Sequence, residues 1–316
     1  MDLRKLAILA AVLAGLCLAA VTLFWFSSRD TSDAPLAKAK AENVSKLQFD
    51  RAGVSTVLER EGDSWRLTSP VRDIADPNPV GDVVNALLGL RIGSEVSSEP
   101  SSYAEYAVDD ASATRVRLYT SESAAPVFDG FFGRKALGYD SLYLRLSSRK
   151  PVHLASGVAP YQLDRHPDEF RERGLTRVDR ATLESVSLRF DSRTLEIAKS
   201  STGFVVSGAE ASPDKVETAV DRILGLRAGD FSDAPTKPSE TGLDKPAIEI
   251  SVRGSARTTR LLVGRSKPGP KGAPSPYRYT QVEGRPALLL VSGADLQSIA
   301  DLILPPALPK RAPARR

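Results

Sequence analysis

Cysteine and histidine are nearly absent from this chain of 316 residues, which contains one Cys and two His. A single Cys excludes a disulfide scaffold and a thiolate metal site. Aromatic residues are also few, at 6%, but hydrophobic residues make up 41% and charged residues 26% of the sequence. That balance excludes wholesale disorder, and the length is enough for one large or two modest domains.

An excess of charge is missing from the body of the chain. The formal net charge is +4, but the first five residues carry +1 and the last seven carry +4, which leaves residues 6–309 at −1. A near-neutral body lacks the positive field that phosphate backbones attract, so we expect no nucleic-acid partner. Residues 305–316 are predicted to be a disordered basic tail.

The sequence has one long uncharged run, the 21 residues Leu6–Phe26. At about 1.5 Å per residue, a helix of that length spans a hydrocarbon layer of about 30 Å. Arg4 and Lys5 precede it, which predicts a cytoplasmic segment 1–5 and a periplasmic body. We therefore expect a single-pass protein of the bacterial inner membrane, with residues 6–26 as its transmembrane helix.

Two processed forms are alternatives to this anchor. A secretory signal has an apolar region of about 7–15 residues and a small-residue cleavage site, whereas this run is longer and ends in Phe24-Trp25-Phe26. A lipoprotein would use Cys17, but Leu16 stands where a small residue is expected. These features favour an uncleaved anchor followed by a tether over residues 27–42.

The chain beyond the tether repeats itself. Three segments recur in order at offsets of 141, 136 and 136 residues: SKLQFD at 45–50 with VSLRFD at 186–191, LLGLRIG at 87–93 with ILGLRAG at 223–229, and LASG at 154–157 with LVSG at 290–293. Ordered matches at nearly constant offset predict two tandem copies of one domain, over 43–176 and 182–304.

Both copies combine strand and helix patterns. Apolar residues alternate with polar ones around Leu47, Leu118, Leu188 and Ile250, which predicts mainly antiparallel sheets with one wet face. The fold class expected is α+β, with helices packed on the sheets.

One helix is expected in each copy, because apolar residues recur at positions i, i+3, i+4, i+7 and i+8 from Val80 and from Val216. Asn78-Pro79 and Ser212-Pro213 are the predicted starts, and Gly93 and Gly229 the predicted ends. A further short helix is expected after Ser292, and residues 267–276 (KPGPKGAPSP) are predicted to be a mobile loop.

Several of these residues resemble the domain-of-unknown-function family 4340. The resemblance is carried by Trp65-Arg66-Leu67-Thr68-Ser69-Pro70, by the turn Gly242-Leu243-Asp244-Lys245-Pro246, by strands ending in Gly133 and Gly264, and by Phe170-Arg171-Glu172-Arg173-Gly174-Leu175. The first copy departs from the turn, with Tyr106-Ala107-Val108-Asp109. The resemblance covers about residues 43–304 and implies a membrane anchor followed by exported α+β domains.

Asp109 and Asp244 occupy equivalent turns. They could act as paired carboxylates for acid–base work or cation binding. The sequence favours a simpler interpretation, in which each carboxylate accepts hydrogen bonds from backbone N–H groups two residues on and fixes its turn.

Ser147-Ser148-Arg149-Lys150 matches the Ser-x-x-Lys pattern of penicillin-binding proteins, but that chemistry needs the Ser at a helix start. Here an alternating strand precedes the tetrapeptide and Pro151 follows it, which predicts a hairpin turn. The companion motifs Ser-Asp-Asn and Lys-Thr-Gly are missing from the sequence.

The remaining candidates have weaker signals. His153 is predicted in a strand and His166 in a loop, a placement that does not favour a zinc site. The Gly264–Gly269 segment is rich in glycine but lacks the consecutive Gly-Lys-Ser/Thr of a phosphate-binding loop, and no Gly-x-Ser-x-Gly elbow anchors a Ser-His-Asp triad. Trp65 and Phe204 fall at matching positions, which favours a core role for both.

We therefore expect no catalytic, cofactor-binding or metal-binding residues and no enzymatic activity. The family resemblance implies an envelope accessory protein of an ABC-type, gliding-like transport complex, with permease subunits as partners. Two alternatives stay open: a glycan- or lipid-binding module that uses a cleft between the copies, and an envelope hydrolase that uses Ser147 and Lys150.

Overall fold

The computed structural model describes residues 36, 38–190, 193–234, 236–270 and 273–304. The predicted transmembrane helix 6–26, Cys17, most of the tether and the tail 305–316 lie outside these ranges. Within them, no helix is long and apolar enough to cross a membrane.

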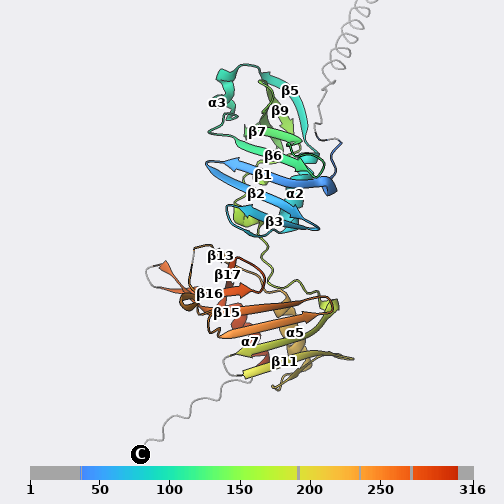
Figure 1. The fold of residues 1–316 in the computed structure, drawn as a ribbon, viewed down its shortest axis with the longest axis vertical. Helices are drawn as coiled ribbons and strands as arrows, with labels where there is room; N and C mark the ends of the chain where they lie inside the picture. Colours follow the sequence, from blue (N-terminus) through green and yellow to red (C-terminus); the bar gives the residue numbers. More distant parts are fainter. Residues whose placement is uncertain (1–35, 37, 191–192, 235, 271–272, 305–316) are drawn as a thin grey trace, which may run out of the picture. The chain divides into compact units, whose positions relative to one another are not determined.

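The chain forms two compact units, each built mainly on one of two sheets, although the strand residues within 66–76 pair in the first sheet and group with the second unit (Figure 1). Of the described residues, the first unit contains those up to Trp65 and Pro77–Glu169. The second contains Arg66–Asp76 and the chain from Phe170 onward. The predicted domain boundaries 43–176 and 182–304 stay predictions, because contacts within a unit do not test whether two segments are copies.

The first sheet has nine strands in the order β4-β3-β2-β1-β6-β7-β8-β9-β5. The pairings β1–β2, β1–β6, β3–β4, β5–β9, β6–β7, β7–β8 and β8–β9 are antiparallel. Its strands are β1 Val44–Arg51, β2 Val54–Glu61, β3 Ser64–Ser69, β4 Asp73–Ile74, β5 Arg91–Ser97, β6 Thr114–Thr120, β7 Phe128–Lys135, β8 Ser141–Leu146 and β9 Val152–Ser156.

The second sheet has eight strands in the order β12-β11-β10-β14-β15-β16-β17-β13, with antiparallel pairings throughout. Its strands are β10 Leu183–Phe190, β11 Arg193–Ser200, β12 Gly203–Ser207, β13 Asp230–Ser232, β14 Ile248–Gly254, β15 Thr258–Pro268, β16 Pro274–Val282 and β17 Leu288–Ser292. Apart from the extra β4, the two sheets follow one strand order.

The helices are few and mostly short, so the α+β class is correct in outline and the sheets dominate it. They are α2 Pro77–Leu88, α3 Tyr103–Tyr106, α4 Pro160–Leu163, α5 Pro213–Leu224, α6 Pro238–Thr241 and α7 Gly293–Ile303. Single 3-10 turns cover η1 Ala41–Asn43, η2 Pro100–Ser102, η3 Pro167–Phe170 and η4 Arg180–Thr182.

The predicted apolar alternation becomes the buried face of each sheet. Leu47 of β1 lies opposite Leu118 of β6, and both are fully buried. Leu188 of β10 lies opposite Ile250 of β14 and is buried in the same way. Period-two burial of this kind leaves the alternate side chains on the opposite, wetter face.

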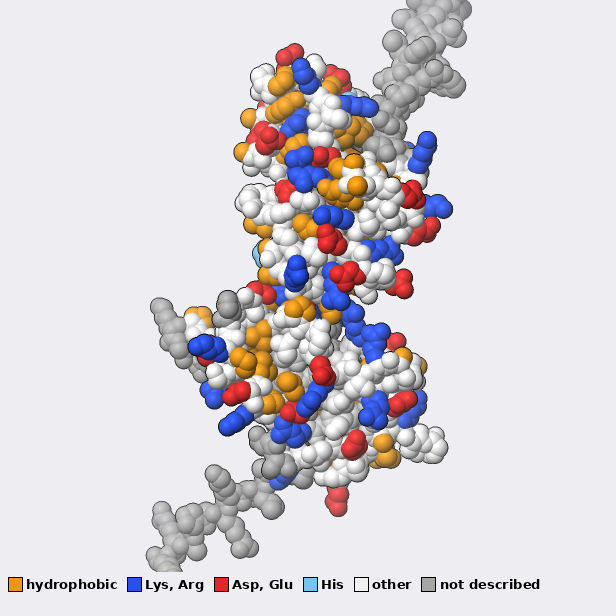
Figure 2. Space-filling view, in the orientation of Figure 1, with side chains coloured by type: hydrophobic (Ala, Val, Ile, Leu, Met, Phe, Trp, Pro, Cys, Tyr) orange, Lys and Arg blue, Asp and Glu red, His pale blue; other side chains and the backbone are white. Residues whose placement is uncertain are grey.

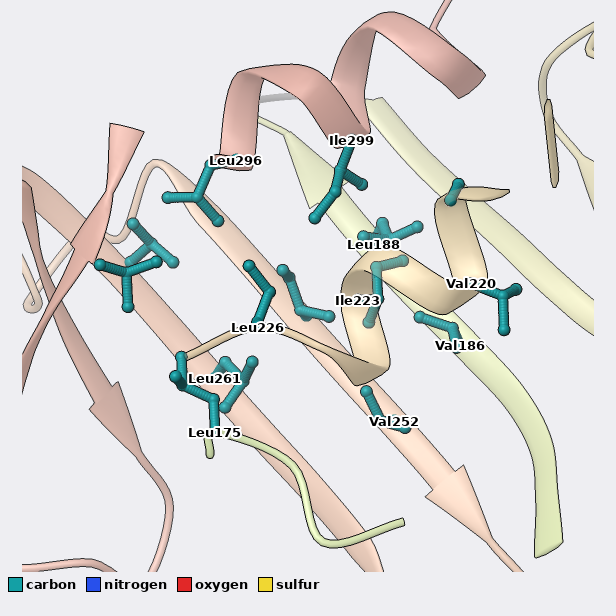
Figure 3. Packing of buried hydrophobic residues seen from close by; sticks show 14 of the residues in the cluster. Leu175, Val186, Leu188, Val220, Ile223, Leu226, Val252, Leu261, Leu296 and Ile299 are labelled. Atoms are coloured by element: carbon teal, nitrogen blue, oxygen red, sulfur yellow. The ribbon is translucent and has the colours of Figure 1, made fainter. Parts of the chain in front are cut away.

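Helices α5 and α7 cover the buried face of the second sheet (Figures 1 and 3). Helix α5 contributes four buried side chains to this core, and helix α7 contributes Leu296, Ile299 and Ile303. Figure 3 shows Ile223 of α5 and Ile299 of α7 beside Leu188 on the strands. Burial of one such aliphatic side chain stabilises a fold by about 1.5–3 kcal/mol, so this layer holds the unit together.

The helix starts were predicted better than the helix ends. Ser212 precedes α5 with Pro213 at its first position, and the Ser292 side chain accepts a hydrogen bond from the Asp295 N–H at the start of α7. Helix α2, however, begins one residue before Asn78.

The predicted ends Gly93 and Gly229 are wrong. Helices α2 and α5 stop at Leu88 and Leu224, Gly93 lies inside β5, and the residue that caps α5 is Gly225. The apolar spacing locates the buried face of a helix, but it does not say which of two nearby glycines ends it.

The segment 267–276 also differs from the prediction. Residues 267–268 belong to β15 and 274–276 to β16, so much of the expected loop extends a hairpin. The pairing of Pro268 with Pro274 carries this hairpin to its tip. The prolines of this segment favour a loop, but Pro268 and Pro274 lie at strand ends, where a strand tolerates proline.

The same close backbone contact occurs in both units, where a short helix meets a strand. A Cβ atom built on Gly133 of β7 would lie 2.1 Å from the carbonyl oxygen of Tyr106, and one built on Gly264 of β15 would lie 2.1 Å from that of Thr241. Both carbonyls belong to the last residue of a short helix, α3 or α6. Glycine is therefore required at these strand positions because nothing larger fits.

The residue after each helix is left-handed. Gly242 has φ +73° and is an unstrained choice there, but its counterpart Ala107 has φ +55°. An L-residue with a Cβ atom is strained by about 1–2 kcal/mol in this region. The first unit thus has a strained residue, Ala107, where the second unit has Gly242.

We predict that Ala107→Gly stabilises the first unit by about 0.5–1 kcal/mol, because it removes this strain while the unfolded chain becomes only slightly freer. Ala104→Gly, one turn earlier inside α3, is the control and is expected to destabilise by a similar amount. Urea unfolding midpoints measure both. A loss of stability in Ala107→Gly would contradict the account.

We also predict that Gly264→Ala destabilises the second unit by about 1–3 kcal/mol, since the new methyl group would press on a backbone carbonyl. Gly81→Ala is the matched control, because a Cβ there meets nothing within 4 Å in α2. It is expected to stabilise, as alanine favours a helix interior. Equal effects of the two substitutions in denaturant melts would disprove the close contact.

Candidate functional site

Ser147 and Lys150 lie in the turn between β8 and β9, as predicted. The N–H of Ser147 donates to the carbonyl of Asp129 (3.0 Å), and the Arg149 N–H donates to the carbonyl of Leu146 (3.1 Å). The carbonyl of Lys150 accepts from the Tyr103 hydroxyl (2.7 Å). A hairpin turn replaces the helix on which Ser-x-x-Lys chemistry depends.

Asp109 fixes its own turn, also as predicted. Its Oδ1 accepts hydrogen bonds from the backbone N–H groups of Ala111 and Ser112, both at 3.0 Å. Burial pushes the pKa of Asp109 upward, but these hydrogen bonds outweigh it and hold the pKa below its ordinary value. Asp244 is exposed in the turn that follows α6, so the structure does not bring the two carboxylates into one unit.

The two histidines have separate local contacts. His153 lies in β9 with its Nδ1 3.2 Å from the Gly93 carbonyl. His166 is exposed, and its Nδ1 lies 3.4 Å from the Asp168 carboxylate. Among the described residues, no three His, Cys, Asp or Glu side chains are grouped so that they could hold a metal ion.

Trp65 and Phe204 are core residues, which confirms the interpretation of their matching positions. They are 8% and 7% exposed. A guanidinium lies over each ring, that of Arg60 over Trp65 (5.9 Å) and that of Arg180 over Phe204 (5.6 Å). Neither ring is available to a ligand.

The wetter face of the first sheet carries stacked arginines and aromatic rings. We call the set Arg115, Arg117, Tyr119, Phe131, Tyr143 and Arg145 the arginine–aromatic face. Arg145 lies between two rings, 4.0 Å from the centre of Phe131 and 4.6 Å from that of Tyr103. Cross-strand register places Arg115, Phe131 and Arg145 in one row.

Ion pairs hold this face in place. Arg115 makes two hydrogen bonds to Asp129 (2.9 and 2.7 Å), and Arg117 pairs with Asp50 (2.9 Å). The hydrogen bond from Arg115, aided by Arg117, lowers the pKa of Asp129 against the effect of burial. The side chains of Arg115 and Arg117 remain 34% and 21% exposed, whereas that of Arg145 is 12% exposed, so the face is ordered and partly reachable.

The second unit contains a buried ionic network that the sequence did not reveal. Its centre is Asp73 of β4, whose side chain is 0% exposed. The Asp73 carboxylate accepts from Arg171 Nε (2.8 Å), from Arg285 Nε (2.7 Å) and Nη2 (2.9 Å), and from the Ile74 N–H (2.8 Å). One carboxylate therefore holds two guanidinium groups.

The other ends of both arginines are also occupied. Arg171 makes two hydrogen bonds to Asp233 (2.7 and 2.9 Å), and its guanidinium stacks 3.7 Å from the centre of the Phe231 ring. Arg285 Nη2 donates to the Glu172 carbonyl (2.6 Å). The carboxylates of Asp73 and Asp233 balance the charges of the two guanidinium groups, which allows both arginines and Asp73 to be buried.

The network connects segments that are far apart in the sequence. Asp73 and Arg171 are separated by 98 residues, and Asp73 and Arg285 by 212. Backbone hydrogen bonds join the same segments, from Asp76 N to the Phe170 carbonyl (2.8 Å) and from Glu172 N to the Ile74 carbonyl (2.9 Å). The network thus fixes residues 66–76 and 170–175 to the rest of the second unit.

Two hollows flank the network within the second unit. One of about 430 Å³ lies on the Asp233 side and is lined by residues that include Arg72, Thr241 and Gln281. Another of about 350 Å³ lies on the Arg285 side and is lined by Arg177, Arg257 and the Thr258-Thr259 pair among others. Both are large enough for a small ligand.

Sequence reasoning could have noticed part of this network. Arg171 lies in the segment Phe170–Leu175, and Asp73 follows Pro70 by three residues, so both belong to or adjoin the family-like motifs. No local pattern points to Arg285 or Asp233, because their partners are remote in sequence.

The chain belongs to a family described as Domain of unknown function (DUF4340), whose sequence profile matches residues 65–246. The match begins at Trp65 and ends at Pro246, the first and last residues of two motifs that carried the resemblance. It is shorter than the expected 43–304 and does not reach Gly264. No curated protein and no solved structure matches the chain.

We predict that Asp73→Asn destabilises the second unit by about 3–5 kcal/mol, because it leaves two buried guanidinium groups without their shared anion. Asp244→Asn, at an exposed turn, is the control and is expected to change stability by less than about 0.5 kcal/mol. Denaturant unfolding of both variants measures the difference. A loss below about 1 kcal/mol for Asp73→Asn would contradict a structural role for the network.

Proposed function

We propose that this protein is a membrane-anchored, periplasmic interaction protein without enzymatic activity, accessory to an ABC-type, gliding-like transport complex. The arginine–aromatic face of the first unit carries the proposal and is the docking surface for an envelope-exposed part of the permease. The family itself has no assigned activity.

The anchor is supported by the sequence. The uncharged run Leu6–Phe26 has the length of a membrane span, and Arg4 and Lys5 favour a cytoplasmic N-terminus. A body held close to the membrane meets the exposed parts of membrane proteins at high effective concentration.

Two tandem copies of one domain are supported by the shared strand order of the two sheets. They are supported again by the same close contact at Gly133 and Gly264. Their side chains have diverged on the wetter face: Arg117, at the position opposite Gln48, corresponds to Glu249 opposite Arg189. We therefore assign docking to one copy rather than to both.

The composition of the arginine–aromatic face suits a protein partner. Arginine and aromatic residues are enriched in protein interfaces and in the few residues that dominate binding energy. The side chains are already ordered by Asp129 and Asp50, so little conformational entropy is lost when a partner binds.

The same geometry argues against catalysis on this face. The hydrogen bond to Asp129 raises the pKa of Arg115 above its ordinary value, despite burial, and lowers the pKa of Asp129. An acid and a base held in this way keep their charges near neutral pH and do not exchange protons there. For Ser147 and Lys150, the hairpin turn disfavours the hydrolase alternative.

We predict that Arg117→Ser combined with Tyr119→Ser lowers recovery of permease subunits by about tenfold, since both side chains belong to the docking face. The measurement is crosslinking in cells, mild detergent extraction and pull-down of the full chain. Arg193→Ser combined with Arg253→Ser removes two exposed arginines of the second unit and is the matched control.

Loss of partners in the control alone, or recovery of no membrane protein by the wild-type chain in several detergents, would contradict the proposal. Recovery of glycan or lipid in place of permease subunits would favour the binding-module alternative. A lost phenotype in Ser147→Ala at normal protein level would favour the hydrolase.

A further inference from the structure

The hollow on the Arg285 side of the network has an unusual set of side chains. Three arginines line it, Arg177, Arg257 and Arg285, together with the neighbouring residues Thr258 and Thr259. Its volume is about 350 Å³, within the range of natural small-molecule sites and ample for one oxyanion with part of a carrier molecule.

Only one of the three arginines is committed to the fold. Arg285 donates to Asp73 and to the Glu172 carbonyl, as described above. Arg177 and Arg257 are exposed, and among the described residues no side chain pairs with either guanidinium. Two cations with free hydrogen-bond donors therefore face a recess.

The hollow also contains acidic side chains, and one of them accepts a hydrogen bond from the backbone. Glu172 and Glu283 line it as well. Glu172 directs Oε1 to the backbone N–H of Gly174 (2.7 Å). Burial is the main cause that lowers the pKa of Arg177; the Glu172 carboxylate raises this pKa, and the guanidinium groups of Arg257, Arg285 and Arg66 lower it. Arg177 therefore lies near one carboxylate and three other guanidinium groups, and its side chain is exposed.

We propose that this hollow is a binding site for a phosphate or phosphomonoester group, held between Arg177 and Arg257. Planar guanidinium groups match the oxygen geometry of phosphate and can each donate two hydrogen bonds to it. The hydroxyls of Thr258 and Thr259 can supply further donors. The site is separate from the docking face of the first unit and does not depend on the proposed function.

The rigid floor of the site favours this assignment. Arg285 is held by the buried Asp73 at two positions, and its backbone lies in the turn between β16 and β17. Arg285 gives the hollow a fixed wall whose charge Asp73 balances, and the exposed Arg177 and Arg257 supply the positive charge for a bound phosphate. The phosphate can be free or can belong to a lipid headgroup.

Titration calorimetry on the full chain in neutral detergent tests this site. The probes are inorganic phosphate, glycerol 3-phosphate and a short-chain phosphatidic acid, whose headgroup is a phosphomonoester. The wild type is expected to bind at least one of them, and Arg177→Gln combined with Arg257→Gln should weaken that binding by about tenfold or more. Tightest binding of the lipid would identify a headgroup as the source, and equal binding of inorganic phosphate a free anion.

Arg193→Gln is the matched control, since it removes an exposed arginine of β11 outside the hollow, and it is expected to bind as the wild type does. If the double variant has an altered circular dichroism spectrum, Arg177→Lys combined with Arg257→Lys replaces it. That pair keeps the charge, loses the planar donors, and is expected to bind more weakly than the wild type. Absence of binding by the wild type, or equal affinities of wild type and variants, would overturn the proposal.

Discussion

The second unit depends on a single buried carboxylate. Asp73 neutralises Arg171 and Arg285 where neither could be buried alone, and Asp233 completes the balance. A buried ionic group of this kind adds little net stability relative to a well-packed apolar cluster, because desolvation offsets its attraction. Its value lies in specificity, since each guanidinium has one arrangement that satisfies its donors. The network therefore selects how residues 66–76 and 170–175 are placed.

That placement also shapes the surface. Arg285 is held by its hydrogen bonds to Asp73, and this fixes one side of the hollow that Arg177 and Arg257 also line. In the first unit, ion pairs to Asp129 and Asp50 order the arginine–aromatic face in a comparable way. In both cases acidic residues fix part of an arginine cluster, and other parts of the cluster remain exposed to a partner. The proposed binding surfaces thus follow from how charge is arranged within each unit.

The sequence predicted local features well and remote pairings poorly. Alternation around Leu47 and Leu188, the helical spacing from Val80 and Val216, and the turn at Ser147 all depend on neighbours in the chain, so they were correct. Helix ends at Gly93 and Gly229 were wrong because several glycines lie close together and packing chooses among them. The ionic network was missed, since Asp73 meets Arg285 across 212 residues and no periodicity records such a contact. The left-handed backbone of Ala107 could not be predicted, because the sequence showed only that Ala107 stands where the turn at Gly242 has glycine.

Native-state hydrogen exchange at the amides of Asp76 and Glu172 tests the central claim most directly. These N–H groups bond to the carbonyls of Phe170 and Ile74 beside the network. If Asp73 fixes both segments to the second unit, the two amides exchange only when that unit unfolds globally, with the same free energy of opening as core amides of β10 and β14. Exchange through a local opening several kcal/mol below the global value would contradict the account, because the segments would then open while the unit stays folded.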